Sequence, residues 1–470
     1  MPSIPPSRNR SAILTVMCAG MFLVLLDVTI VNVALPAIGR DLDAPVAALQ
    51  WVVDGYVVVI AGLLLAAGTV GDRIGHRRML LAGFAVFGAA SLACAMAPTV
   101  GVLIAARVVQ GVGAALLLPS TMAVIVDVFP QRREQAKALG TWAAVSSLAL
   151  PAGPLLGGVL VEHFGWRPVF WIAAPLTVAA VIAARIAVPA SAPSMADRVD
   201  VPGLLGFVVG LGAAVFAITS AGHHADSRTV TVAVVVAICA LATAVAAARR
   251  SDHPFLPLDL LQRRQFLAPN VVAATMNLIL NGVLFVGMLY LQDIAGQSPA
   301  TAGVTVLPIA VPLVVLAPVS ARLTARYGPR SAIAIGCVLA ACGSLALLTV
   351  GGSGIVGLLV AFAALGCGAG LVTTAVVAAT VRATPAERSG LATGVSNTAR
   401  QVGTACGVAV FGAVAGAPSS PDFLDGIHML AAGSAIAWTG ALLLTVLAMD
   451  SESGAADASG HRETPRPARR

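Results

Sequence analysis

Apolar runs long enough to cross a lipid bilayer recur along this chain from one end to the other. A transmembrane helix needs about 20 consecutive apolar residues, because the hydrocarbon core of a bilayer is about 30 Å thick. Dividing the chain at its polar or Gly- and Pro-rich interruptions predicts fourteen such helices. They cover residues 12–38, 47–70, 79–97, 100–127, 137–161, 167–188, 202–221, 229–248, 266–292, 301–325, 330–350, 354–380, 389–415 and 428–449.

The composition excludes a soluble globular protein. Hydrophobic residues make up 58% of the 470 residues and charged residues only 10%, whereas soluble domains carry roughly a quarter charged residues. The seven cysteines all lie in apolar runs and show no metal-ligand spacing, so we interpret them as small buried hydrophobes. The first run, 12–38, is too long for the apolar part of a signal peptide and is predicted to be a retained span.

The basic residues predict the orientation of the spans. If the N-terminus is cytoplasmic, the outer loops hold only Arg40, Arg167 and Arg228 of the 28 Lys and Arg residues. Arg107 and Arg400 fall within spans, and the remainder lie on the cytoplasmic side. Because positively charged loops stay in the cytoplasm, both termini are predicted to be cytoplasmic in a multi-pass protein of the inner (cytoplasmic) membrane. The net charge of +7 then reflects topology and not a nucleic-acid partner.

The chain resembles itself at a separation of about 253 residues. Residues 71–77 align with 324–330, and residues 111–114 align with 366–369. Two six-helix halves around a site at the membrane midplane are a known transporter layout. The sequence therefore predicts an all-α polytopic protein with four parts: an N-terminal six-helix half, a linker with two extra spans, a C-terminal six-helix half and a disordered cytoplasmic tail. Their bounds are 11–188, 189–250, 251–449 and 450–470.

The two halves differ in their charges. The first half has charged residues where the second half has neutral ones, and this asymmetry predicts that ion coupling belongs to the first half. The aligned positions are Asp27 with Asn281, Asp72 with Ala325, and Arg107 with Phe362.

The loop between the second and third spans combines glycines with arginines. Its glycines permit a tight reversal between helices, and its arginines hold the loop inside. Asp72 is placed to accept bonds from a helix N-terminus of the other half, which would make a breakable latch; an ordinary basic turn is the alternative. The segment 68–78 resembles the loop signature of the major facilitator superfamily, with His76 at a position that is usually basic. The resemblance implies a conformational latch of Gly68, Asp72, Arg73, Gly75 and Arg77.

Asp27 lies in the middle of the first span. An ionised carboxylate there costs about 2.5–3.5 kcal/mol on insertion scales, so such a residue is usually paired, protonated or functional. The segment 26–36 resembles the first-span signature of the fourteen-span drug:proton antiporter branch of that superfamily. The resemblance implies that Asp27 takes part in proton coupling. The alternative is a structural carboxylate that bonds a neighbouring helix.

Arg107 gives the fourth span a permanent cation. It shares one helix face with Gln110, Gly111 and Ala114, which are spaced i, i+3, i+4 and i+7. This segment resembles the fourth-span signature of the same branch, which implies a role for Arg107 in proton coupling. A structural pair with a carboxylate remains the alternative.

The fifth span carries a motif of prolines and glycines. A proline inside a helix removes a backbone hydrogen bond, and glycines permit bending and close packing. Without its context such a string would indicate only helix packing. It resembles the antiporter motif of the superfamily, with Ala149 where a glycine is usual, and the resemblance implies export over uptake. The motif residues are Pro151, Gly153, Pro154, Gly157 and Gly158.

Other polar residues within spans are candidates for a substrate cavity. Asn277 and Asn281 belong to a polar stripe on the ninth span, which lines a cavity or binds a neighbouring helix. Asp54 and Asp293 lie near outer span ends, where a surface role is favoured and a share in proton coupling stays open. The candidate cavity residues are Asn32, Gln110, Asn277, Asn281 and Arg400.

The resemblance covers residues 11–449 and implies a proton-coupled antiporter that exports drugs, antibiotics or other small hydrophobic compounds. The alternatives are a metabolite or siderophore exporter, an uptake symporter of the same fold, and a transport-inactive membrane sensor. We find no nucleophile–base pair, metal spacing or phosphate loop, so an enzyme is not expected. The expected partners are a small molecule, protons and the lipid bilayer, and the protein is expected to be a monomer without a cofactor. The sequence leaves the substrate and the stoichiometry open.

Overall fold

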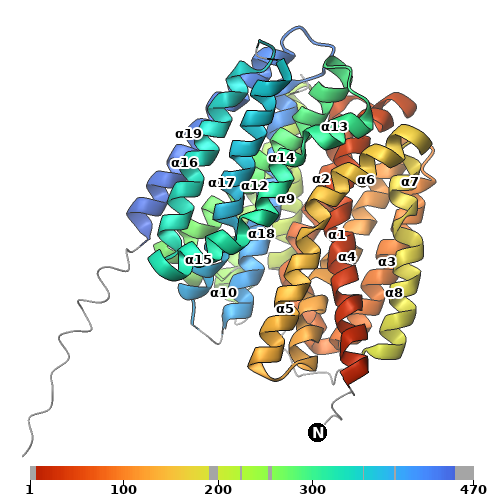
Figure 1. Ribbon diagram of the computed structural model, residues 1–470, viewed down its shortest axis with the longest axis vertical. Helices are drawn as coiled ribbons and strands as arrows, with labels where there is room; N and C mark the ends of the chain where they lie inside the picture. The colour runs from red at the N-terminus through yellow and green to blue at the C-terminus, as the bar shows by residue number, and fades with distance from the viewer. Residues whose placement is uncertain are drawn as a thin grey trace, which may run out of the picture.

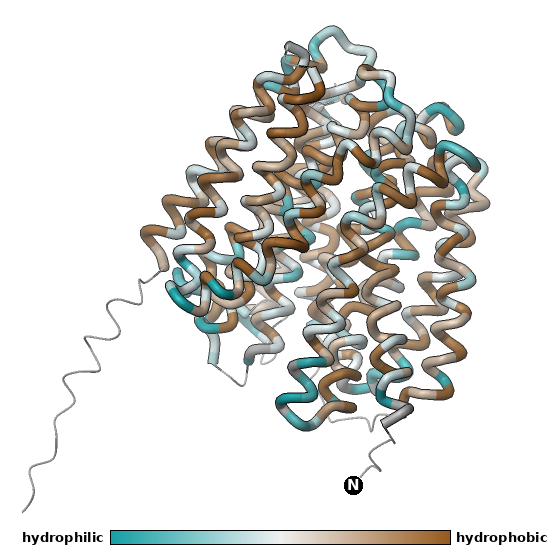
Figure 2. The backbone as a smooth tube through the Cα atoms, viewed as in Figure 1, coloured by the Kyte–Doolittle hydropathy of each residue, from teal (hydrophilic) through white to brown (hydrophobic). Residues whose placement is uncertain are grey.

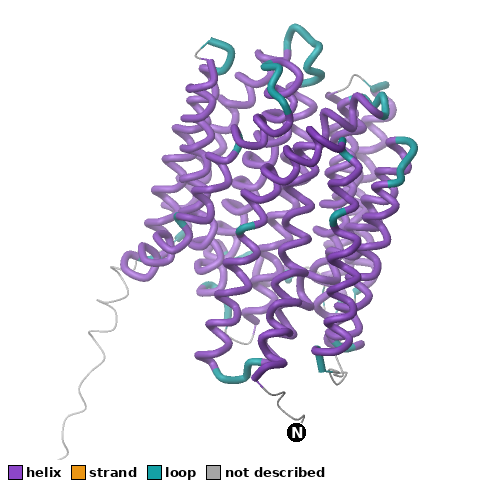
Figure 3. Tube along the Cα trace, turned by 45° about the vertical axis from the view of Figure 1, so that its right-hand side comes forward, coloured by secondary structure: helices purple, strands orange, loops and turns teal. Residues whose placement is uncertain are grey.

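The described part of the chain consists of helices joined by turns and loops. The computed structural model describes residues 7–189, 200–222, 225–251, 254, 257–352, 354–385 and 388–449, and these contain no strand (Figure 3). Apolar residues cover the middle of the helix bundle, and polar residues gather toward its two ends (Figure 2). We call the end at which the first helix begins the lower end and the opposite one the upper end, as in Figure 1. The predicted tail, 450–470, and residues 190–199 of the predicted linker lie outside the described residues.

The N-terminal half comprises the helices before residue 188. In it α4 packs against α1, α2 and α3, while α6 packs against α1 and α8 packs against α3. The helices are α1 (Ser7–Asp41), α2 (Val46–Ile74), α3 (His76–Ala95), α4 (Val100–Val128), α5 (Arg132–Ser147), α6 (Ala149–Phe164), α7 (Arg167–Trp171) and α8 (Ala173–Ala187).

The C-terminal half begins with a short helix and repeats this pattern. In it α17 packs against α12, α14 and α16, and α18 packs against α12. Its elements are α11 (Leu258–Leu261), α12 (Arg264–Leu289), a π-helical turn (Tyr290–Ile294), α13 (Pro299–Thr305), α14 (Leu307–Val315), α15 (Ala317–Tyr327), α16 (Pro329–Ala346), a 3-10 turn (Leu347–Thr349), α17 (Gly354–Arg382), α18 (Ser389–Ala415) and α19 (Phe423–Ala448).

Two further helices connect the halves. α9 (Val201–Gly222) packs against α2 of the first half and α18 of the second, and α10 (Ser227–Arg250) packs against α9. Much of α10 is exposed outside the bundle. The interposed pair therefore covers the side of the molecule where α2 meets α18.

Helices occupy each of the fourteen predicted ranges. Among the described residues, twelve helical segments are long and apolar enough to cross a membrane, and α14 with α15, bent by 45°, would make a thirteenth. The remaining range, 389–415, coincides with α18. This helix is less apolar because it contains Asn397, Arg400 and Gln401. The count of fourteen spans stays a prediction.

The internal repeat is visible in one turn of each half. Gly75, between α2 and α3, has φ = 90°, and Gly328, between α15 and α16, has φ = 77°. L side chains rarely adopt this left-handed region, so glycine is required at both turns. In each turn the glycine N–H donates to the carbonyl four residues earlier, that of Gly71 or Thr324. The two glycines are separated by the offset that the sequence repeat predicted.

Polar contacts join the two halves at the upper end. Arg40 of α1 forms an ion pair of 2.7 Å with Asp293, in the π-helical turn after α12. The Glu162 carboxylate of α6 accepts hydrogen bonds from the Ser298 hydroxyl at 2.7 Å and from the Ala300 N–H at 3.0 Å, at the start of α13. The carboxylate thus caps a helix of the other half, where the unpaired N–H groups favour negative charge.

Candidate functional site

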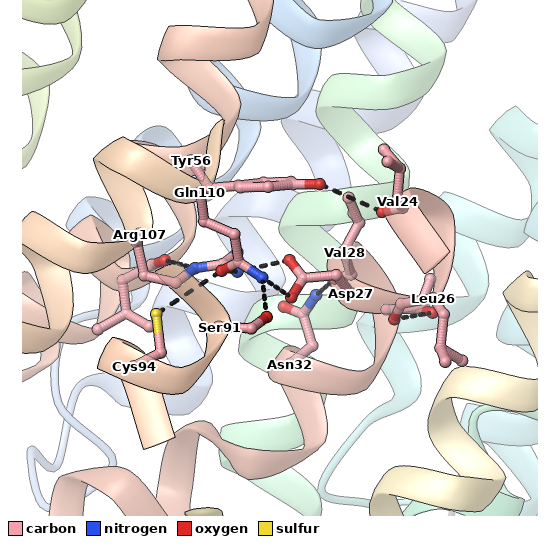
Figure 4. Close-up of polar contacts among 12 residues, drawn as sticks. Val24, Leu26, Asp27, Val28, Asn32, Tyr56, Ser91, Cys94, Arg107 and Gln110 are labelled. Carbon is pink, nitrogen blue, oxygen red and sulfur yellow. Dashed lines mark hydrogen bonds and ion pairs between the residues drawn. The ribbon is translucent and has the colours of Figure 1, made fainter. Parts of the chain in front are cut away.

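A buried ion pair lies inside the N-terminal half. Arg107 of α4 donates to the Oδ2 atom of Asp27 of α1 at 2.5 Å (Figure 4). The exposed fractions of the two side chains are 1% and 8%. Sequence analysis selected both residues separately, and the structure brings them together. Because neither charge can be hydrated well, each depends on the other for its stability in the bundle.

Gln110 links this pair to α3. Its side-chain N–H₂ donates to Asp27 Oδ1 and to the Ser91 hydroxyl, both at 2.8 Å, and its Oε1 accepts from Arg107 at 2.7 Å. Both oxygens of Asp27 therefore have a donor. Arg107 also donates through Nε to the carbonyl of Val52 in α2, at 2.9 Å. The cluster thus ties together α1, α2, α3 and α4.

Sequence analysis missed Tyr56 and Ser91. The Tyr56 ring lies 4.2 Å from the Arg107 guanidinium carbon, within cation–π distance. Its hydroxyl donates to the Val24 carbonyl at 3.3 Å. Both residues are fully buried. The only signal in the sequence is that each is a polar residue within an apolar run, which does not indicate its partner.

Two candidate cavity residues lie inside the N-terminal half. The exposed fractions are 0% for Gln110 and 2% for Asn32. Asn32 donates to the carbonyl of Val28 on its own helix, at 2.8 Å. In this conformation neither residue is open to a bound molecule, and Gln110 contacts Asp27 instead. Their predicted role in a cavity would require another conformation.

The structure places Asp54 elsewhere than the sequence predicted. The sequence favoured a solvent-accessible residue near a span end, but Asp54 is fully buried in α2. Neither oxygen of its carboxyl group has a hydrogen-bond partner within the described part of the chain. Gln50, one turn earlier on α2, donates to the carbonyls of Val408 and Ala409 on α18, both at 2.9 Å. Asp54 therefore lies where the two halves pack against each other.

The glycines of the fifth-span motif pack against two different helices. A Cβ atom on Gly157 would lie 2.9 Å from the Ile30 Cγ1 atom of α1. A Cβ atom on Gly158 would lie 2.7 Å from the Ala300 Cα atom of α13, in the other half. Real Cβ atoms essentially never approach so closely. The two glycines are therefore required for α6 to lie between α1 and α13.

The other motif residues fit the same packing. Gly153 faces Thr29 of α1, and the Pro154 carbonyl lies against Gly303 of α13. Pro151 is half-buried in the first turn of α6, just after the break at Leu148. The motif thus forms part of the contact between the two halves at the upper end.

Only some residues of the predicted latch in the loop 68–78 can be described. Gly75 makes the turn described above, and nothing packs close to Gly68. Arg73 is exposed, whereas Arg77 donates to the Arg185 carbonyl of α8 at 2.6 Å, within the same half. The Asp72 side chain lies outside the described part of the structure. The latch stays a prediction.

The remaining candidates lie where α12 meets α18. Asn281 of α12 donates to the Thr404 hydroxyl of α18 at 3.1 Å, and Asn277 donates to the Ala273 carbonyl at 2.9 Å. Asn277, Asn281 and Arg400 are all half-buried. Unlike Gln110, these three side chains are partly exposed in this conformation.

Comparisons with known proteins agree with the fold and the sequence. The family described as Major Facilitator Superfamily matches residues 17–408. A methylenomycin A resistance protein of Streptomyces coelicolor is 36% identical over 424 residues, which are 90% of this chain and 89% of the relative. The multidrug resistance protein Stp of Mycobacterium tuberculosis is 32% identical over 409 residues, 86% of this chain and 76% of the relative.

The fold is also that of solved transporters. A crystal structure of the POT family transporter PepTSo matches with a TM-score of 0.67 at 16% identity, covering 98% of this chain and 99% of that one. An identity this low supports the fold alone. Together with the family match and the apolar helices, these likenesses show that this multi-pass membrane protein belongs to the major facilitator superfamily.

Proposed function

We propose that this protein exports drugs, antibiotics or other small hydrophobic compounds across the cytoplasmic membrane in exchange for protons. The observation that carries the proposal is the buried pair of Asp27 and Arg107, an ionisable group at mid-span in the half that has kept its charges. Ionisable residues inside membrane spans are rare and mark proton and substrate pathways. The names of the relatives, which refer to methylenomycin A and to several drugs, support export.

Alternating access in this fold moves one six-helix half against the other around a central site. The contacts at the upper end, Arg40 with Asp293 and Glu162 with Ser298, must then break when the protein opens on that side. The glycine contacts of α6 with α13 allow the same surfaces to close again. A proton taken up by Asp27 would weaken its ion pair with Arg107 and so favour a different packing of α1 against α4.

A susceptibility panel in a pump-deficient bacterial host tests this function. Cells that express the protein should tolerate higher concentrations of one or more antibiotics than cells with an empty vector. The matched control is Asp27→Asn at equal expression, which should remove the resistance. Collapse of the proton gradient should restore drug accumulation in the cells with the unchanged protein. Resistance that persists after both treatments would contradict proton-coupled export.

The topology gives a prediction of its own. Both termini are expected in the cytoplasm, because the loops on that side hold most of the arginines. Reporter fusions placed after Arg250 and after the last residue, Arg470, should both report a cytoplasmic location. A signal from outside at either site would contradict an even number of spans before it.

The motif on α6 gives a second prediction. Gly157→Val and Gly158→Val should each impair transport more than expression, because an added side chain separates α6 from α1 or from α13. Overpacking of this kind typically costs about 1–3 kcal/mol. The matched control is Leu156→Val, because Leu156 is exposed on the same helix. Normal transport by both glycine variants at normal expression would show that this contact tolerates a larger side chain.

A further inference from the structure

Arg400 lies in the middle of α18. Its guanidinium group has no hydrogen-bond or ion-pair partner among the described residues. Arg400 lies eleven residues after the start of α18, which places it about 17 Å along the helix at 1.5 Å per residue. Arg107, the arginine within α4, has an ion pair and two further hydrogen bonds. An unpaired arginine at this depth is costly, so such residues face a polar interior and usually have a function.

The contacts of α18 show which way Arg400 faces. Gly403 and Gly407 lie against the backbone of α12, and Gln50 of α2 bonds to α18 at Val408. An α-helix turns 100° per residue, so Arg400 lies on the side of α18 between the face that contacts α12 and the face that contacts α2. Ala413, which contacts α9, lies on the other side. Arg400 is thus directed toward the region between the two halves and not toward the surrounding lipid.

Asn397 and Thr404, which lie one turn from Arg400 on α18, are polar and neutral. Asn397, one turn earlier, is exposed, and Thr404, one turn later, accepts a hydrogen bond from Asn281. The Thr404 hydroxyl itself donates to the backbone carbonyl of Arg400, at 3.1 Å. Arg400, Asn277 and Asn281 are each half-buried. This face therefore offers hydrogen bonds and one positive charge to a bound molecule.

No carboxylate among the described residues of the C-terminal half lies at this level of the span. The acidic residues described in that half are Asp259, Asp293, Asp422 and Asp425, and each lies in a loop or within a turn of a helix end. In the N-terminal half, Asp27 is already bound by Arg107 and Gln110. Asp54 is enclosed in the contact of α2 with α18 and makes no bond to Arg400 among the described residues.

We propose that Arg400 binds an anionic oxygen group, such as a carboxylate, of the exported compound, with Asn277 and Asn281 as neutral hydrogen-bonding partners. The planar guanidinium group suits this role, since its paired N–H groups match the two oxygens of a carboxylate. The same charge repels a lipophilic cation. This inference rests on the proposed function and specifies the substrate class of that site as acidic compounds.

Two dyes with the same xanthene skeleton and opposite charge test the site. Fluorescein carries a carboxylate, whereas rhodamine 123 is its cationic, esterified counterpart. Binding of each dye to the purified full-length protein in nanodiscs is measured by fluorescence anisotropy. The unchanged protein should prefer fluorescein, and Arg400→Gln should weaken fluorescein binding by roughly tenfold to a hundredfold, the range for a hydrogen bond to a charged group. Arg400→Lys should retain part of the affinity, and Arg400→Glu should favour rhodamine 123.

The control is Arg322→Gln, which removes an exposed arginine of α15 and should leave fluorescein binding unchanged. Size-exclusion chromatography and thermal unfolding identify any variant that has lost its fold, and the Arg400→Lys variant then carries the comparison. Equal affinity of Arg400→Gln and the unchanged protein for fluorescein, a preference for rhodamine 123, or binding of neither dye would overturn the proposal. Fluorescein binding through Arg400 in a protein that confers no resistance would keep this site and contradict export instead.

Discussion

Replacing Arg107 by alanine is expected to lower the free energy of unfolding by about 3–5 kcal/mol, the range for removing one partner of a buried ion pair. The loss is large because Asp27 would keep its burial but lose the donor at 2.5 Å. Gln110 Oε1 would lose its donor at 2.7 Å and keep only the Cys94 thiol at 3.7 Å, and the Val52 carbonyl would lose its side-chain partner as well. The Tyr56 ring would lose the cation against its face.

Two further variants separate the charge from the packing. Arg107→Lys keeps the charge but cannot reach Asp27, Gln110 and Val52 together, so it should be intermediate. The double variant Asp27→Asn with Arg107→Gln removes both charges and should recover much of the stability lost in Arg107→Ala. Chemical denaturation in mixed micelles measures each difference. A loss below about 1 kcal/mol for Arg107→Ala, the scale of an exposed ion pair, would contradict the buried arrangement.

The positions of the helices were predictable because the apolar runs fix them. The range 389–415 coincides with α18, and the repeat placed the two glycine turns at Gly75 and Gly328 correctly. The breaks within spans were not predicted. A span of 301–325 is divided into α13, α14 and α15, because Pro308 and Pro318, at the starts of α14 and α15, do not continue the hydrogen bonding of the preceding helix.

The candidate site was predicted as separate residues and not as a cluster. Periodicity places Arg107 and Gln110 on one face of α4, but it does not show which helix lies opposite. The contact of Asp27 with both depends on how α1 and α4 cross, which is a property of tertiary packing. Tertiary packing also explains the wrong prediction for Asp54. Its position near the end of a span suggested access to solvent, but α18 of the other half covers it.

Replacing Asp27 by asparagine is expected to abolish substrate-driven proton movement while substrate binding is partly retained. Asparagine keeps an oxygen that accepts from Arg107, so the cluster can remain assembled, but it cannot carry a proton. A proton-driven exporter needs a group whose affinity for protons differs between its two conformations. A tenfold difference is worth about 1.4 kcal/mol, and a potential of 100 mV moves one charge with about 2.3 kcal/mol, so a single carboxylate is sufficient.

Asp54→Asn is the matched comparison, since both residues are buried carboxylates of the same half but have different neighbours. Asp27 is held by donors within its own half, whereas Asp54 lies where α2 meets the opposite half and has no hydrogen-bond partner in the described part of the protein. Proteoliposomes that enclose a pH-sensitive dye should show substrate-driven proton flux for the unchanged protein and none for Asp27→Asn. If Asp27→Asn keeps the flux and Asp54→Asn loses it, the proton is carried at the contact of α2 with α18. The movement of one half against the other would then change the surroundings of the carrier directly, because α18 covers Asp54 only while the two halves pack together at that point.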